Sequence, residues 1–145
     1  MAAPVSDALV FFGATGDLAE KQIFPALQAM VRHKHLDMPI IGVAWHDWTL
    51  GQFRAHARES LEKHGVVDEA VFAKLAALLQ YVRGGDDDLD TFKRLRQALG
   101  NAQHPIHYLA IPPSLFEVVA ANLAQSGCAE GARVVVEKPF GHDPV

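Results

Sequence analysis

Small residues recur at three-residue intervals in one short segment near the start of the chain. The segment reads Gly13-Ala14-Thr15-Gly16-Asp17-Leu18-Ala19 and follows an apolar run. Gly13 permits a tight turn, Gly16 lets backbone approach a ligand closely, and Ala19 leaves room for a helix to pack on a strand. Helix N–H groups after such a turn attract phosphate. The pattern predicts a dinucleotide site, and the alternative is a glycine-rich turn without a ligand.

A second group of polar and aromatic residues, Trp45-His46-Asp47, follows the next apolar run. Residues in this position read the adenosine ribose, where an acid favours a free hydroxyl and a cation accommodates a 2′-phosphate. Trp45 could stack on adenine or could equally serve packing. Asp47 could accept from a ribose hydroxyl, and Thr15 could donate to a phosphate. Both NADP and NAD are therefore admissible cofactors.

Two further segments carry candidate groups. Lys138 stands between an apolar run and Pro139, and Ile111 precedes the pair Pro112-Pro113. A lysine is most often a solvated surface charge, but Lys138 could hydrogen-bond a sugar hydroxyl or hold a phosphate. Proline ends a strand, so Pro112 and Pro113 predict a loop.

Short apolar runs supply the strands that would position these groups. The expected strands are 8–12, 40–44, a weak one at 81–82, 106–111 and 133–136. Runs of this length without polar alternation are typical of parallel strands covered on both faces.

Helical spacing of apolar residues fills the intervals between the strands. A first helix is expected over 17–32, with a kink at Pro25. Thr49 and Asp68 are expected N-caps of two further helices, and a fourth surrounds Phe92, Leu95 and Leu99. Ser114 and Glu117 predict a capping box for a last helix that ends near Gly127.

Strands that alternate with helices predict an α/β fold, a doubly wound parallel sheet with helices on both faces. Ligands of such sheets bind at the carboxyl ends of the strands. Three unusual loops, 13–19, 111–114 and 137–141, are expected at those ends. The site is therefore expected where these loops meet.

Composition excludes several other classes of function. The 145 residues have a net charge of −4, without a basic cluster, which argues against nucleic-acid binding. Cys128 is the single cysteine, and the histidines form no metal-ligand pattern, so neither a disulfide nor a metal site is expected. No apolar run reaches the roughly 20 residues of a membrane span. A cytoplasmic protein without membrane or nucleic-acid partners is expected.

The segments 13–19, 108–113 and 136–141, in this order and spacing, resemble those of glucose-6-phosphate dehydrogenases. The resemblance spans nearly the whole chain and implies a Rossmann-like N-terminal NAD(P)-binding domain over 1–145, incomplete at its C-terminal end. It implies oxidation of glucose 6-phosphate at C1 to the lactone, the first step of the pentose phosphate pathway, by a full-length protein that forms homo-oligomers.

The resemblance also implies roles for particular residues. The glycine loop would bind the NADP pyrophosphate, and Gly85, Asp86 and the segment 111–113 would approach the cofactor. Lys138 would contact both the sugar and the cofactor.

Two positions depart from the family pattern. Trp45 replaces the arginine that usually pairs with the 2′-phosphate, and Gln22 replaces a common lysine. Because the family's sugar-phosphate segment and catalytic histidine are not among these residues, no catalytic residue and no turnover are expected of the 145 residues alone. The alternatives are another sugar dehydrogenase and a stand-alone dinucleotide-binding or sensing module.

Overall fold

The sheet at the centre of the molecule is parallel throughout. We describe it from a computed structural model, in which residues 6–17, 19–34 and 37–136 are described. The strands are β1 (Ala8–Phe12), β2 (Ile40–Ala44), β3 (Leu79–Arg83), β4 (Pro105–Leu109) and β5 (Arg133–Val136). Their order in the sheet is β3-β2-β1-β4-β5. This order confirms the predicted doubly wound α/β fold, because the chain extends the sheet first on one side of β1 and then on the other.

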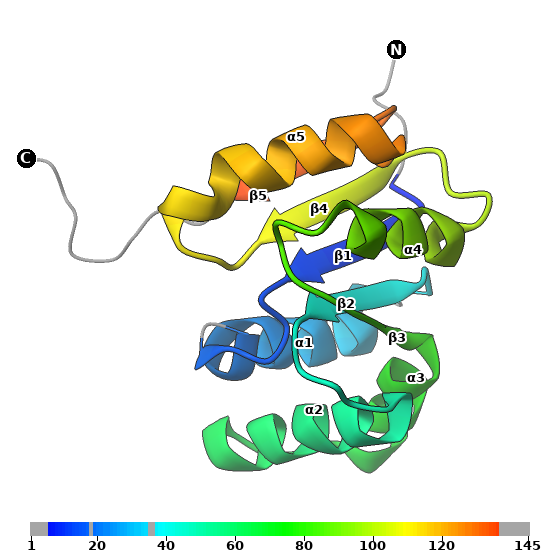
Figure 1. The fold of residues 1–145 in the computed structure, drawn as a ribbon. Helices are drawn as coiled ribbons and strands as arrows, with labels where there is room; N and C mark the ends of the chain where they lie inside the picture. The colour runs from blue at the N-terminus through cyan, green and yellow to red at the C-terminus, as the bar shows by residue number, and fades with distance from the viewer. Residues whose placement is uncertain (1–5, 18, 35–36, 137–145) are drawn as a thin grey trace, which may run out of the picture.

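Helices cover both faces of this sheet (Figure 1). They are α1 (Phe24–Lys34), α2 (Leu50–His64), α3 (Glu69–Leu78), α4 (Leu89–Leu99) and α5 (Phe116–Ser126). The first three share one core cluster with the sheet, and α4 and α5 share the other. None of the described helices is long and apolar enough to cross a membrane.

The central strand β1 contributes to both cores, as its continuous apolar sequence predicts. Phe11 packs edge-on against Phe24 of α1, with ring centroids 5.6 Å apart. Its neighbour Phe12 points to the opposite face and stacks on Phe92 of α4, also at 5.6 Å. All these rings are fully buried. Burial on both faces fixes β1 and therefore the loop that follows it.

Strand β4 ends two residues earlier than the apolar run 106–111 predicts. Its last residue, Leu109, pairs with Phe12 of β1 and with Val136 of β5. Because β1 turns away after Phe12, Ala110 makes one more bond, from its N–H to the Phe12 carbonyl at 3.1 Å, and the chain then leaves the sheet. The strand length is therefore set by its neighbours rather than by its own sequence.

The kink expected at Pro25 stays a prediction, and the structure shows a change of helix type just before this residue. A π-helical turn, η1 (Ala19–Ile23), leads directly into α1, and Pro25 lies in the first turn of that helix. Proline has no N–H to donate to a carbonyl four residues back, and in a π turn the bonds reach five residues back. The wider turn ends two residues before Pro25.

The helix ends confirm some of the expected caps. Thr49 caps α2, and with Gln52 it forms a capping box. Asp68 caps α3, and Gly127 ends α5 in the left-handed conformation.

The capping box predicted for Ser114 and Glu117 is wrong. Ser114 lies inside a 3₁₀ turn, η2 (Pro113–Leu115), and α5 begins only at Phe116, without a side-chain cap. Pro112 and Pro113 set the chain direction here, and Pro113 starts the 3₁₀ turn, which delays the α-helix beyond the position where Ser114 could cap it.

One histidine is buried inside the sheet. His107 of β4 is fully buried, and its Nε2 donates to the Cys128 carbonyl oxygen at 2.8 Å. Its Nδ1 is buried without a hydrogen-bond partner among the described residues. Burial lowers the pKa of His107 below its usual range, against the opposing effect of the bond to Cys128. The folded state therefore holds this ring neutral.

We expect the free energy of unfolding to fall as the pH drops below about 6.5, the ordinary histidine pKa. Below this value His107 is protonated in the unfolded chain but stays neutral in the folded chain. The free energy of unfolding therefore falls with pH until the pH reaches the lower pKa of folded His107. Urea unfolding between about pH 5 and 8 gives the free energy of unfolding at each pH. The slope of this free energy against pH should be smaller in His107→Gln than in wild type, by up to about 1.4 kcal/mol per pH unit. The exposed His33 gives a control variant, His33→Gln, which should keep the wild-type slope. Equal slopes in His107→Gln and wild type would contradict this assignment.

Candidate functional site

The loop after β1 is held against both neighbouring strands. The N–H groups of Gly13 and Ala14 donate to the Val43 carbonyl oxygen of β2, at 3.0 and 3.2 Å. Gly13 has a φ of +80°, and a Cβ at this position would overlap the carbonyl oxygen of Ala110, just after β4. Both the conformation and the close approach require glycine.

The second glycine of the loop has open space around it. Gly16 is exposed, and a Cβ built on it would meet only the Gly13 oxygen, at 3.4 Å. Ala14 and Ala19 are fully buried behind the loop, and Asp17 is exposed. Leu18 lies outside the described residues. The arrangement leaves the backbone around Gly16 accessible to a ligand, supported by small buried side chains.

The turn after β2 is tied to the glycine loop. The Thr15 hydroxyl and the His46 Nδ1 share a hydrogen bond of 2.7 Å, and the Trp45 ring stacks on His46 with centroids 4.1 Å apart. Trp45 is 69 % exposed, so its ring is not part of the core and offers an aromatic surface. Tyr81 donates from its hydroxyl to the His46 carbonyl at 2.6 Å. Burial raises the pKa of Tyr81 to about 12, which keeps this donor protonated.

The loop after β3 forms the next wall. Gly84 donates from its N–H to the Ala44 carbonyl at 2.8 Å, and a Cβ on Gly84 would overlap the Thr91 hydroxyl of α4. Asn122 of α5 donates to the Asp86 carbonyl at 3.0 Å. Burial, with a smaller effect of Asp87, raises the pKa of Asp86. Contacts with β2, α4 and α5 thus fix this loop.

These loops enclose a pocket of about 280 Å³ at the carboxyl ends of the strands. The predicted residues that line it are Gly13, Thr15, Gly16, Trp45, Gly85, Asp86, Ile111 and Pro112. Ala14, Asp17, Ala19 and Pro113 do not line it. Lys138 lies outside the described residues, so its predicted contact with this pocket stays a prediction.

The prediction missed four lining residues. They are Ala44, Gly84, Ala110 and Leu115. Ala44 and Ala110 are small residues at or just after a strand end, a signal that the apolar runs contained. Gly84 gave a weaker signal, because its role depends on Thr91, which approaches it from another element.

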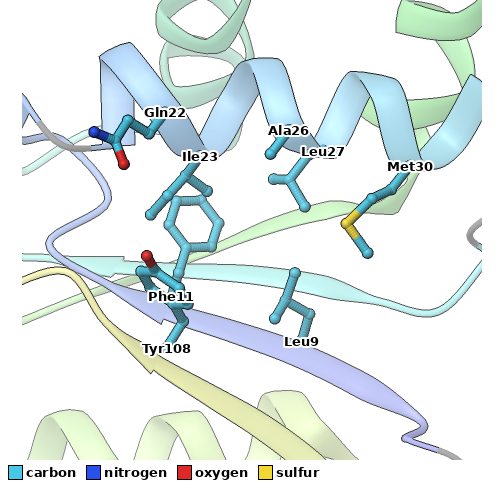
Figure 2. Close-up of a pocket in the computed structure, with 8 residues that line it drawn as sticks. All are labelled: Leu9, Phe11, Gln22, Ile23, Ala26, Leu27, Met30 and Tyr108. Carbon is cyan, nitrogen blue, oxygen red and sulfur yellow. The ribbon is translucent and has the colours of Figure 1, made fainter. Parts of the chain in front are cut away.

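A second pocket, of about 320 Å³, lies between α1 and strands β1 and β4 (Figure 2). Leu9, Leu27 and Met30 give it apolar walls, and Gln22 and Tyr108 lie toward the end opposite Met30. Its walls present no glycine backbone to a phosphate, whereas the strand-end pocket is lined by four glycines. The strand-end pocket is therefore the candidate site.

No group of three or more metal-ligating side chains is found within residues 6–17, 19–34 and 37–136. The strand-end pocket instead offers glycine backbone, the Trp45 ring and the Thr15 hydroxyl group. Such a set suits a large, flat and phosphorylated ligand.

A family model described as "Glucose-6-phosphate dehydrogenase, NAD binding domain" matches residues 10–145. A relative from Mycobacterium tuberculosis, glucose-6-phosphate 1-dehydrogenase 1, is 48% identical over 138 residues. That match covers 95% of this chain and 30% of the relative. The chain therefore spans about a third of the length of the relatives it matches.

Two solved structures agree with this result. The crystal structure of glucose-6-phosphate 1-dehydrogenase from Mycobacterium avium matches with a TM-score of 0.88 and 46% identity, over 96% of this chain and 31% of that one. A glucose-6-phosphate dehydrogenase in complex with its substrate glucose-6-phosphate matches with a TM-score of 0.82 and 32% identity, over 99% and 33%. The resemblance inferred from the three sequence segments is confirmed.

Proposed function

The chain belongs to the glucose-6-phosphate dehydrogenase family, and we propose on that premise that it is the coenzyme-binding part of an enzyme that oxidises glucose 6-phosphate with NADP. The observation that carries the proposal is the pocket in which the glycine loop, the Trp45 turn and the Ile111 loop meet. NADP would supply the hydride acceptor for C1 of the sugar, which becomes the lactone.

Different residues of the pocket are proposed to bind different parts of the cofactor. The backbone around Gly16 is open on its outer side, which suits a pyrophosphate. The exposed ring of Trp45 suits stacking on adenine. Ile111 and Pro112 give an apolar wall beside the glycine loop. Lys138 would contact the sugar and the cofactor.

The whole protein is proposed to act as a cytoplasmic homo-oligomer at the first step of the pentose phosphate pathway. Its support is the family name shared by the relatives and the single, buried Cys128, which suits a reducing compartment. Residues 1–145 are proposed to be the N-terminal NAD(P)-binding domain, which contributes Lys138 to substrate binding, with the catalytic groups and those for assembly outside them.

The substitution Gly16→Ala, which adds a single methyl group, should weaken dinucleotide binding without affecting the fold. In Gly16→Ala the new Cβ meets only the Gly13 oxygen, so the fold should be unchanged, yet it occupies the side from which a pyrophosphate would approach. We expect Gly16→Ala to weaken NADP and NAD binding at least about ten-fold in calorimetric titration, or about 1.4 kcal/mol.

The matched control is Gly51→Ala on α2, where a Cβ would meet only the Thr49 hydroxyl, at 3.8 Å. This variant should keep both the wild-type melting temperature and the wild-type affinity. A folded wild-type chain that binds neither dinucleotide, or a Gly16→Ala chain that binds both as wild type does, would refute the proposed site.

A further inference from the structure

A third pocket, of about 420 Å³, adjoins the strand-end pocket. The two share Trp45, Gly84 and Gly85, and Arg83, Arg94 and Asp88 complete the lining of the third. The strand-end pocket itself has no cationic side chain among its lining residues. A ligand that extends over Trp45 from the strand-end pocket into the third pocket would therefore meet two guanidinium groups, both in the third pocket.

Sheet register places the first of these groups. Arg83 is the last residue of β3 and pairs with Ala44, the last residue of β2, directly before Trp45. Its side chain is 60 % exposed, and its Nε lies 3.8 Å from the Asp47 carboxylate. An exposed pair at this distance contributes little to stability, so the guanidinium can change partner at low cost.

Helix α4 places the second group. Arg94 donates from its Nη2 to the Arg83 carbonyl oxygen, and a Cβ on Gly84 would come within 2.8 Å of the same Nη2. The Arg94 guanidinium is thus held against the backbone between Arg83 and Gly84. This bond uses one of its five N–H groups.

We propose that Arg83 and Arg94 bind the 2′-phosphate of NADP while Trp45 stacks on its adenine, and that these arginines set the preference for NADP over NAD. The proposal rests on the dinucleotide site of the proposed function. An arginine near the end of the second strand is the usual means of accommodating a 2′-phosphate, and Trp45 itself brings no charge. Guanidinium groups bind phosphate through paired hydrogen bonds.

Two carboxylates near these arginines oppose a phosphate: Asp88 lines the pocket, and Asp47 pairs with Arg83. Asp88 accepts from the Asp90 N–H at 3.0 Å, which directs its carboxylate to the start of α4. Asp47 is the partner of Arg83 and is 83 % exposed. A phosphate that carries up to two charges competes well with this single, solvated carboxylate.

The test is calorimetric titration of wild type, Arg83→Gln and Arg94→Gln with NADP and, separately, with NAD. We expect each variant to bind NADP about ten-fold more weakly or worse and to bind NAD as wild type does. Lys93→Gln is the matched control, because Lys93 is an exposed cation on α4 that does not line the pocket. It should leave both affinities unchanged.

The outcomes separate the two proposals. If Arg83→Gln weakens NADP and NAD binding equally, or neither, the assignment of the 2′-phosphate to this pocket is overturned while the dinucleotide site stands. If the folded wild type binds neither NADP nor NAD, both proposals fall. Circular dichroism of Arg94→Gln checks that loss of its backbone bond has not unfolded α4, and titration with 2′,5′-ADP against 5′-AMP should repeat the selective loss in both variants.

Discussion

Gly13→Ala is expected to lower the free energy of unfolding by about 2–5 kcal/mol. The φ of +80° is a conformation that costs a residue with a Cβ about 1–2 kcal/mol. Overlap of that Cβ with the Ala110 carbonyl oxygen, and its 3.3 Å approach to the Ile111 side chain, add about 1–3 kcal/mol. Relief would require β1 and β4 to separate where they pair. Since domains of this kind are stable by about 5–15 kcal/mol, the loss is a large fraction of the total.

Urea unfolding followed by circular dichroism measures this loss, with Gly16→Ala as its control. Gly16 lies in the same loop, has no positive φ and has open space beside it, so its variant should stay within about 0.5 kcal/mol of wild type. If Gly13→Ala unfolds at the wild-type urea concentration, the close approach of the loop to β4 is refuted. A loss of stability in Gly13→Ala and a loss of dinucleotide binding in Gly16→Ala would show that the two glycines have different roles.

Local sequence patterns were sufficient to predict most of the strands. The runs 8–12 and 40–44 coincide with β1 and β2, because both strands lie inside the sheet and need apolar residues on both faces. The weak run at 81–82 is part of the longer β3, whose Arg83 is exposed at the end of the strand. An edge strand can carry polar residues, so its apolar signal is shorter than the strand itself.

Contacts between distant segments explain what the sequence could not predict. The bond between Thr15 and His46 joins residues 31 positions apart, and the pairing of β3 with β2 places Arg83 opposite Ala44, directly before Trp45. Neither contact has a local pattern. The Ser114 pattern, in contrast, was present but misleading, since the preceding prolines determine where α5 begins. The strand register and the direction of the chain after the prolines thus determine the parts of the site that local sequence patterns could not predict.

Phe53→Ala is expected to have the largest effect among core substitutions, because this ring connects the core to the site. Phe53 of α2 is fully buried, with ring centroids 5.8 Å from Phe24 and 4.9 Å from Tyr81. Removing it should lower the free energy of unfolding by about 3–5 kcal/mol. Tyr81 would also lose the packing that holds its hydroxyl on the His46 carbonyl, so dinucleotide affinity should fall in the chains that remain folded.

Phe72→Ala is the matched control for this substitution. Phe72 of α3 is only partly buried and has the Arg58 guanidinium 5.6 Å above its ring, so its loss leaves a site open to water. Urea unfolding should show a smaller loss for Phe72→Ala than for Phe53→Ala, and dinucleotide titration should show no change. Equal losses of stability would contradict the larger contribution assigned to Phe53.

A double-mutant cycle with Gly42 tests the packing of Phe53 on the sheet directly. A Cβ on Gly42 of β2 would lie 2.5 Å from the Phe53 ring, so Gly42→Ala alone should destabilise by about 1–3 kcal/mol through overpacking. In the Phe53→Ala background the ring is gone and the same methyl group enters the cavity, although Ala14 remains 2.9 Å away. The loss of stability in the double variant should therefore be smaller than the sum of the two single losses, by about 1 kcal/mol or more. Additive losses would contradict direct contact between the Phe53 ring and Gly42, which pairs with Tyr81 in the middle of β2 and β3.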